Sequence, residues 1–252
     1  MILQVGDAVS AEDCRRLLTI YDRHVPLTKV SDYTGHPVVY WDQLRDTPEA
    51  AEIVPRLVEE CLRYTAGRLE LESPLYPETV VLAAIGPGGH HSRHADNCRQ
   101  NEQGEWVANH TPQRDISAIY YLNEEFDGGE TAFEQTQLTV KPRRGLLLAF
   151  PSDAEHVHEV LPVRSGVRYT MPIWFTKQQG CALSTGSLGL PRSRDRGPPP
   201  PKASLADLCG GEIVLEPVMP RDWCTDTTGF RARALGGVRE RTTPLKGAPT
   251  AP

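Results

Sequence analysis

Two stretches in the first seventy residues carry apolar side chains at the three- and four-residue spacing of an amphipathic helix. The first follows Ser10, a residue type that caps helix N-termini, and acidic residues occupy its first turn. The second begins near Thr47-Pro48 and extends to Gly67, and Pro55 is expected to interrupt or kink it. The apolar positions are Cys14, Leu17, Leu18 and Tyr21 in the first helix, and Val54, Leu57, Val58, Cys61 and Leu62 in the second.

From residue 78 the pattern changes to short, nearly continuous apolar runs separated by turns rich in Gly and Pro. These runs predict β-strands at residues 79–85, 116–122, 145–150 and 167–175. Helices followed by several short strands predict an α+β chain whose core is a jelly roll. Pro172 lies inside the last run and is expected at a sheet edge or a bulge, because proline cannot donate a ladder hydrogen bond.

The composition changes again near residue 180, which gives three expected regions. Residues 1–77 form a helical support region, residues 78–178 form the jelly-roll core, and residues 179–252 form a largely irregular tail. About a quarter of the residues from 181 onward are Pro or Gly, a proportion typical of disordered segments. Within this tail, the apolar segment Ile213-Val214-Leu215 is long enough to pair as one short strand.

Charge and cysteine content exclude several classes of protein. The chain has 252 residues and a net charge of −6, which argues against a general nucleic-acid binder. No apolar run approaches the ~18 residues of a membrane span, and the N-terminus lacks the pattern of a signal peptide, so a cytoplasmic location is expected. The six cysteines form no C-x-x-C pair, and free thiols are expected, with a Cys209–Cys224 disulfide left open.

The strongest chemical signal is the sequence His94-Ala95-Asp96, followed much later by His158. Residues i and i+2 of a strand face the same side, so His94 and Asp96 can bind one ion. A second imidazole from a distant strand would complete a two-histidine-one-carboxylate set, which leaves coordination positions open on Fe(II). Taken alone, the H-x-D spacing also fits a polar strand end on the surface.

Ten residues after His158, Arg168 lies just inside the last predicted strand. A buried guanidinium is unfavourable unless an anion compensates its charge, and its fork suits a carboxylate. A structural ion pair is the alternative interpretation.

With these residues in place, the sequence resembles the Fe(II)/2-oxoglutarate-dependent prolyl hydroxylases over about residues 78–176. The H-x-D-N-C and R-D-x-S-A segments are similar to the prolyl 3-hydroxylase (leprecan) branch, and Tyr-Leu-Asn and His-Glu-Val are similar to the oxygen-sensing prolyl 4-hydroxylases. The matching segments are 94–98, 114–123, 126–133 and 150–174.

The resemblance implies a fold, a reaction and a role for each matching residue. The fold is a double-stranded β-helix, and the reaction couples decarboxylation of 2-oxoglutarate to succinate and CO2 with hydroxylation of a C–H bond by O2. His94, Asp96 and His158 would bind iron, and Arg168 and Tyr121 would bind the distal carboxylate of 2-oxoglutarate. Ascorbate sustains many members of the family.

Other residues near these motifs have competing interpretations. His156 faces the same side of a strand as His158 and is expected at the rim or behind the metal ligands. Candidates for substrate contact are Asn97, Trp106 and Trp174, of which Trp106 lies in a polar insert (residues 99–113) that is either a lid or a solvated loop. A zinc cluster of His94 with His90, His91 and His110 is the less favoured alternative to iron, and these three are expected to line the mouth of the site.

The substrate and the partners are less determined than the reaction. The first hypothesis is a prolyl residue in a peptide or protein, and the second is a free amino acid or a small natural-product intermediate. The second stays open because Ile85 stands near the position where many prolyl hydroxylases have a tyrosine. A third hypothesis is a non-catalytic binding module of the same fold. No membrane or nucleic-acid partner is expected, and the oligomeric state is undetermined.

Overall fold

The computed structural model describes residues 1–27, 36–68, 73–183, 188 and 213–216. Residues Met1–Val218 form one compact unit. Cys209 and Cys224, for which a disulfide was left open, both lie outside the described part of the chain. No described helix is both long and apolar enough to cross a membrane. The four described cysteines, Cys14, Cys61, Cys98 and Cys181, are free thiols.

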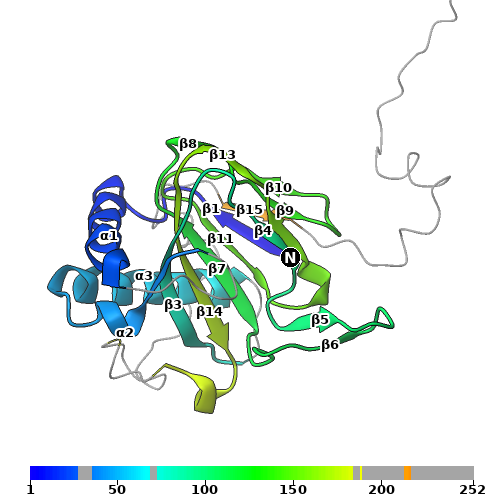
Figure 1. Ribbon diagram of the computed structural model, residues 1–252. Helices are drawn as coiled ribbons and strands as arrows, with labels where there is room; N and C mark the ends of the chain where they lie inside the picture. Colours follow the sequence, from blue (N-terminus) through cyan, green and yellow to red (C-terminus); the bar gives the residue numbers. More distant parts are fainter. Residues whose placement is uncertain (28–35, 69–72, 184–187, 189–212, 217–252) are drawn as a thin grey trace, which may run out of the picture. The chain divides into compact units, whose positions relative to one another are not determined.

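Three α-helices and fifteen strands make up the described fold (Figure 1). The helices are α1 (Ala11–His24), α2 (Trp41–Leu44) and α3 (Pro48–Arg68), with 3-10 turns η1 (Val25–Leu27), η2 (Ala154–His156) and η3 (Gln179–Cys181). The strands are β1 (Ile2–Val5), β2 (Val38–Tyr40), β3 (Tyr76–Ile85), β4 (His91–His94), β5 (Cys98–Gln100), β6 (Trp106–Ala108), β7 (Ile116–Tyr121), β8 (Phe126–Gly128), β9 (Thr131–Phe133), β10 (Thr139–Val140), β11 (Leu147–Pro151), β12 (His158–Val160), β13 (Val163–Gly166), β14 (Arg168–Thr176) and β15 (Ile213–Glu216).

Two antiparallel sheets form the core of the jelly roll. The large sheet has the strand order β15-β1-β11-β7-β14-β3-β2, and the small sheet has the order β10-β9-β12-β4. Two-stranded ribbons, β13-β8 and β5-β6, complete the sheets, and the β5–β6 hairpin extends away from the rest of the fold (Figure 1). The helices lie on one side of the large sheet, and the small sheet lies on the other (Figure 1).

The central strands of the large sheet are buried on both faces, which explains their continuous apolar sequence. On β7, Ala118 and Tyr120 pack with the helices, whereas Ser117, Ile119 and Tyr121 face the small sheet. The same alternation on β3 and β14 points every second side chain into the space between the sheets. The sequence therefore builds a helix-packed core on one face and an inner wall on the other.

Both predicted helices are confirmed, with one difference in the second. The Ser10 side chain accepts a hydrogen bond from the Asp13 amide and caps α1. Helix α3 continues through Pro55 to Arg68, so of the two predicted effects of this proline the interruption is wrong, and the kink stays a prediction. Residues Ile53, Val54, Leu57 and Val58 are fully buried around this proline, and tertiary packing of this kind can hold a helix together where one backbone hydrogen bond is missing.

The predicted strands are present, but the position of Pro172 differs from expectation. Strand β14 lies between β7 and β3 in the interior of the large sheet, and its register shift is at Trp174 and Phe175. Pro172 is therefore neither on an edge strand nor at that bulge. On one side, Pro172 is paired with Ile119 of β7. On the other side it faces β3, where its missing N–H coincides with a gap in the pairing between Thr170–Ala83 and Ile173–Val80.

Segments outside residues 78–178 also contribute to the large sheet. Strands β1 and β2 come from the region expected to be helical, and short strands of this kind carry little periodic signal. The tail segment predicted to pair does so, because β15 runs antiparallel to β1 with Ile2 opposite Glu216. The sheet thus extends beyond the expected boundary at residue 178.

Candidate metal and co-substrate site

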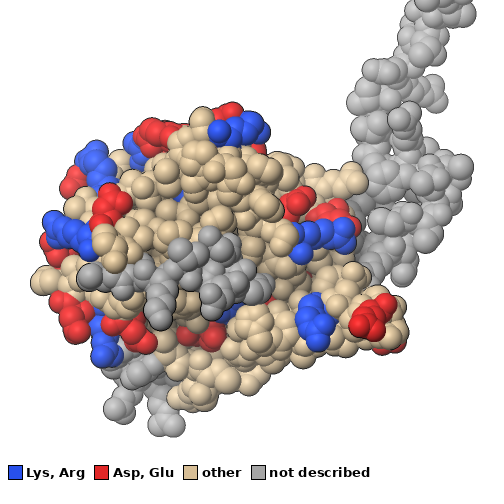
Figure 2. Space-filling view, viewed as in Figure 1, with Lys and Arg blue, Asp and Glu red and all other residues tan. Residues whose placement is uncertain are grey.

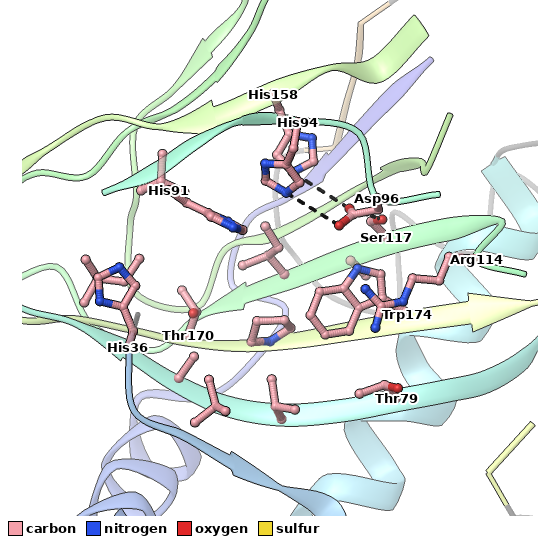
Figure 3. Close-up of a pocket in the computed structure, with 18 of the residues that line it drawn as sticks. His36, Thr79, His91, His94, Asp96, Arg114, Ser117, His158, Thr170 and Trp174 are labelled. Atoms are coloured by element: carbon pink, nitrogen blue, oxygen red, sulfur yellow. Dashed lines mark hydrogen bonds and ion pairs between the residues drawn. The ribbon is translucent and has the colours of Figure 1, made fainter. Parts of the chain in front are cut away.

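The small sheet and the turn after β4 bring the three predicted metal ligands together. His94 at the end of β4 is paired with His158 at the start of β12, and their ring centroids lie 4.4 Å apart. Asp96 follows two residues after His94, with its Oδ1 3.6 Å from His94 Nε2 and its Oδ2 3.8 Å from His158 Nε2. One donor atom from each residue lies within 4.8 Å of the others, so a single ion can contact all three (Figure 3).

Backbone carbonyl groups fix the tautomer of both histidines. His94 Nδ1 lies 2.8 Å from the carbonyl oxygen of Ser92, and His158 Nδ1 lies 3.0 Å from that of His156. A carbonyl oxygen can only accept, so each Nδ1 carries a proton. Each Nε2 therefore presents its lone pair toward Asp96, which is the orientation that a metal-binding histidine requires.

Burial and charge determine how the three groups titrate without metal. Burial, together with the charge of His94, lowers the pKa of His158 to about 4, so this ring is neutral at physiological pH. Burial also acts to lower the pKa of His94, but the carboxylate of Asp96 outweighs it and raises that pKa. The pKa of Asp96 is held below its usual range, because the two histidines and Ser117 outweigh the effect of burial. Because a metal binds the unprotonated Nε2, binding of a cation competes with protonation of His94.

The turn that carries Asp96 is held by several hydrogen bonds. The backbone carbonyl of Asp96 accepts hydrogen bonds from the Asn109 amide group (3.1 Å) and the Thr111 hydroxyl (2.8 Å). The backbone N–H of Asn97 donates to the carbonyl of Ser152 (3.1 Å). Asp96 is 7 % exposed, so its carboxylate is presented to the interior of the cavity rather than to bulk water.

A cavity of about 200 Å³ lies between the metal ligands and the large sheet (Figure 3). Its walls include alternate residues of β3 and β14, and the metal ligands lie on the opposite side. The residues of these two strands that line it are Thr79, Val81, Ala83, Ile85, Arg168, Thr170, Pro172 and Trp174. The donor set at one wall and the single buried cation on β14 give the cavity two chemically different ends.

Arg168 is 3 % exposed and lacks an acidic partner among the described residues. Its Nε donates to the carbonyl of Gly129 (3.0 Å), one amino group lies 3.4 Å from Thr131 Oγ1, and its Cζ lies 5.1 Å from the centre of the Tyr121 ring. Burial lowers the pKa of Arg168, but an arginine still remains charged. The cavity therefore offers a desolvated positive charge for which a carboxylate is the natural partner.

Gly129 makes room for this arginine. Its φ is +67°, and a Cβ at this position would lie 2.9 Å from Arg168 Cδ. A glycine is required here on both grounds. Tyr121 is fully buried and reaches the same cluster, since its hydroxyl lies 2.8 Å from Thr131 Oγ1. Arg168, Thr131 and Tyr121 thus form one group, here called the arginine cluster.

The remaining candidates from the sequence separate into those at the cavity and those away from it. Trp174 lines the cavity, and the guanidinium of Arg114 stacks on its ring at 4.0 Å while Arg114 Nε donates to Glu78 (3.1 Å). His156 is buried elsewhere, with its ring between Asp153 (2.7 Å) and the Met1 amine (3.1 Å). Asn97 donates to the carbonyl of Arg114, and Trp106 lines a second recess that shares His94 and His110 with the cavity.

Of the three histidines expected at the mouth, His91 and His110 line the cavity, whereas His90 is exposed. A register shift between β4 and β12 places His91 opposite Val160, and its ring lies 4.1 Å from that of His94. His91, His90 and His110 do not join a group of metal ligands among the described residues, where the cluster found is His94, Asp96 and His158. Ile85, the residue near the position of the family's tyrosine, lines the cavity as an apolar wall.

Thr131, Gly129, Ser117 and Ser152 lie in the segments that resemble the family, but the sequence alone assigned them no role in the site. Ser117 could have been found from the alternation of β7, because it faces the same side as Tyr121 four residues later. Thr131 follows Gly128-Gly129-Glu130, a segment that predicts only a turn. Its approach to Arg168 depends on contacts between β9 and β14, which residue spacing does not reveal.

Comparisons with known proteins place these features in a family. Residues 80–176 match the 2OG-Fe(II) oxygenase superfamily. Prolyl 3-hydroxylase 2 of Gallus gallus is 34 % identical over 204 residues, which cover 68 % of this chain and 29 % of that protein. Prolyl 3-hydroxylase 2 of Mus musculus is 35 % identical over 94 residues, 34 % of this chain and 13 % of that protein. The chain thus spans less than a third of the length of these relatives.

Solved structures show the same fold at lower sequence identity. A collagen prolyl hydroxylase of Paramecium Bursaria Chlorella virus-1, in complex with 2OG, has a TM-score of 0.55 at 17 % identity, over 73 % of this chain and 96 % of that one. A prolyl hydroxylase of Trichoplax adhaerens, in complex with a hypoxia inducible factor peptide, has a TM-score of 0.54 at 21 % identity, over 73 % and 86 %. The sequence match, the double-stranded β-helix and the His-Asp-His cluster agree, and residues 80–176 of this chain form a 2OG-Fe(II) oxygenase domain.

Proposed function

We propose that this protein is an Fe(II)- and 2-oxoglutarate-dependent dioxygenase that hydroxylates a prolyl residue in a peptide or protein. The observation that carries the proposal is the pairing of a two-histidine-one-carboxylate cluster with the buried, uncompensated Arg168 on the walls of one cavity. The first group matches the ligand set of non-heme Fe(II) oxygenases. The second provides a cation for the distal carboxylate of 2-oxoglutarate.

Each residue of the site has a role in this proposal. His94, Asp96 and His158 hold the metal, and Arg168 and Thr131 bind the distal carboxylate, with Tyr121 supporting Thr131. When bound, Fe(II) would supply the activation of O2, from which one oxygen atom enters succinate and the other enters the new hydroxyl group of the product. The protein's contribution is to orient both substrates and to exclude water with the apolar walls of β3 and β14.

The relatives and the cavity wall support a prolyl substrate. The curated relatives are named prolyl 3-hydroxylases, and one structural neighbour was solved with a peptide of a hypoxia inducible factor. In this chain, Ile119, Pro172 and Trp174 give an apolar surface beside the metal ligands. Arg114, fixed by Glu78 and stacked on Trp174, stands at this surface with further N–H groups available to donate to a carbonyl group.

The test is mass spectrometry of products from the purified protein with Fe(II), 2-oxoglutarate, O2 and a library of prolyl peptides and free amino acids. The expected result is a gain of one oxygen atom on a peptide proline, with one succinate formed per hydroxylation. His158→Ala is the negative control, and parallel reactions with and without ascorbate test whether ascorbate sustains turnover. Hydroxylation of a free amino acid alone would contradict the peptide assignment, and no succinate under any condition would contradict the enzymatic one.

A further inference from the structure

Two buried serines lie behind the carboxylate of Asp96. Ser117 is on β7 of the large sheet, and Ser152 directly follows β11 of the same sheet. Ser117 Oγ donates to Asp96 Oδ2 at 2.6 Å, and Ser117 Oγ and Ser152 Oγ lie 2.8 Å apart. Ser117 is 2 % exposed and Ser152 is 1 % exposed. A short bond to an ionised acceptor that is shielded from water belongs to the stronger class of hydrogen bonds.

The direction of both hydrogen bonds follows from the groups involved. The ionised carboxylate can only accept, so the hydroxyl proton of Ser117 points to Asp96 Oδ2. Ser117 then has no proton left for Ser152, and the hydroxyl of Ser152 must donate to Ser117 Oγ. The two serines therefore act in series on the same oxygen atom of Asp96.

The hydroxyl of Ser117 is not needed to hold the backbone of this turn. The Asp96 carbonyl is bound by Asn109 and Thr111, and the Asn97 N–H is bound by the Ser152 carbonyl. None of these bonds uses the hydroxyl of Ser117. This hydroxyl instead contacts the carboxylate itself, at Oδ2.

We propose that Ser117, supported by Ser152, is a positioning residue that makes Asp96 a one-oxygen ligand of the metal. Because Oδ2 is engaged by Ser117, Oδ1 is the oxygen available to the metal. An Asp96 that bound through both oxygens would occupy one further coordination position, which the co-substrate and O2 require. This inference rests on the proposed function for the identity of the metal and of the incoming ligands.

The experiment measures metal binding to the full chain without turnover. Fe(II) is titrated under anaerobic conditions into the parent, Ser117→Ala, Ser117→Thr and Ser152→Ala, and the same proteins are loaded with Co(II), whose visible absorption reports coordination number. Ser165→Ala, on the exposed strand β13, is the matched control. Ser117→Ala is expected to weaken Fe(II) binding by about 10- to 100-fold, the usual effect of losing a partner of a metal ligand. Its Co(II) spectrum is expected to change.

The other variants separate positioning from simple packing. Ser117→Thr keeps the hydroxyl and is expected to restore the parent Co(II) spectrum, whereas Ser152→Ala is expected to weaken Fe(II) binding less than Ser117→Ala. If Ser117→Ala does not fold, Ser117→Cys replaces it, since a thiol of similar size is a weaker donor and the same changes are expected.

An unchanged Fe(II) affinity and Co(II) spectrum in Ser117→Ala would overturn the proposal. A parent protein that binds Fe(II) but forms no succinate would instead contradict the proposed function. The Fe(II) affinities and Co(II) spectra of the Ser117 variants would still test the positioning role of Ser117.

Discussion

The two ends of the cavity are built on different electrostatic principles. At the metal end, each histidine donates Nδ1–H to a carbonyl, and Asp96 accepts from Ser117. At the other end, Arg168 has a backbone carbonyl, a hydroxyl and an aromatic ring around it, all of them formally neutral. The metal end is thus oriented within the protein itself, whereas the arginine end retains a charge that is compensated only by a ligand.

This difference assigns separate tasks to the two ends. A metal ion requires donor atoms fixed in advance, because three ligands must converge on one point. A flexible dicarboxylate can adjust its own torsions, so one strong, desolvated cation is sufficient to select it. Acidic and basic side chains lie next to one another on the face shown in Figure 2, whereas the buried charge of Arg168 lies in the cavity. Substitutions at the two ends should therefore have distinguishable effects.

The largest effect is expected at the metal end. His158→Ala removes one of three protein ligands and should weaken Fe(II) binding by at least about 100-fold, since losing even a partner of a ligand costs 10- to 100-fold. His94→Ala should behave similarly, and both should abolish succinate formation. The measurement is anaerobic Fe(II) titration followed by a succinate assay.

His156→Ala is the matched control for the metal end. It lies two residues from His158, but its ring is bound to Asp153 and the Met1 amine. It should retain Fe(II) binding close to that of the parent. If His156→Ala formed no succinate while His158→Ala remained active, the assignment of His158 as the metal ligand would be wrong.

The second effect concerns the affinity for 2-oxoglutarate. Removing one member of a buried charged pair costs about 3–5 kcal/mol, which corresponds to an increase in Kd of about 100-fold or more. Arg168→Ala should show this loss while Fe(II) still binds, and Arg168→Lys should be intermediate because lysine keeps the charge but loses the fork. Binding is followed by the charge-transfer absorbance of the anaerobic Fe(II) protein.

Arg164 provides the matched control for the arginine end. Its side chain is 58 % exposed and pairs with Asp127 at 2.6 Å, in the ribbon next to the arginine cluster. Arg164→Ala should change the Kd for 2-oxoglutarate by less than about fivefold. Equal Kd values for Arg168→Ala and the parent would leave Arg168 a purely structural residue.

The sequence predicted the metal end better than the rest of the site, for a physical reason. His94 and Asp96 are only two positions apart in the sequence, so they lie close together even though β4 ends at His94 and Asp96 lies in the turn that follows. Their distant partner His158 and the buried Arg168 could be named as candidates from the sequence, but their roles as metal ligand and co-substrate partner came from the resemblance to a family. Thr131 and Gly129 approach Arg168 through the packing of separate strands, and no local periodicity encodes such contacts.

The fold shows the same limit. Helices α1 and α3 and the long strands β3, β7 and β14 carry enough periodic residues to be predicted. The short strands β1 and β2 do not. The interior position of Pro172 was missed for a related reason. The sequence shows that this residue has no backbone N–H, but it does not show whether a neighbouring strand has a carbonyl group that needs one.

A smaller loss of 2-oxoglutarate affinity is expected from Thr131→Val. The Thr131 hydroxyl lies between an amino group of Arg168 (3.4 Å) and the Tyr121 hydroxyl (2.8 Å). Valine keeps the shape and removes both contacts. A hydrogen bond to a charged group contributes about 1.5–3 kcal/mol, so the Kd should rise by roughly 10- to 100-fold, less than for Arg168→Ala.

Tyr121→Phe tests whether the hydroxyls of the arginine cluster act together. It should cause a smaller rise in the Kd for 2-oxoglutarate than Thr131→Val, because phenylalanine keeps the ring beside Arg168 and loses only the hydroxyl that contacts Thr131. An increase larger than that of Thr131→Val would show that Tyr121 binds the carboxylate itself.

The smallest effect is expected on the stability of the ligand-free protein. Breaking a buried ion pair costs about 3–5 kcal/mol. Arg168, however, has no carboxylate partner among the described residues. Replacing a buried charge by an apolar side chain is often neutral or stabilising. Arg168→Met should therefore change the free energy of unfolding by less than about 1 kcal/mol, measured by urea denaturation of the metal-free protein. The comparison is then repeated on the Mn(II)-loaded protein with 2-oxoglutarate at 100 times the parent's Kd. Ligand binding should stabilise the parent by about 2.7 kcal/mol and the variant by much less. A large loss of stability in metal-free Arg168→Met would show that the protein itself compensates this charge, and the contrast between the two ends of the cavity would not hold.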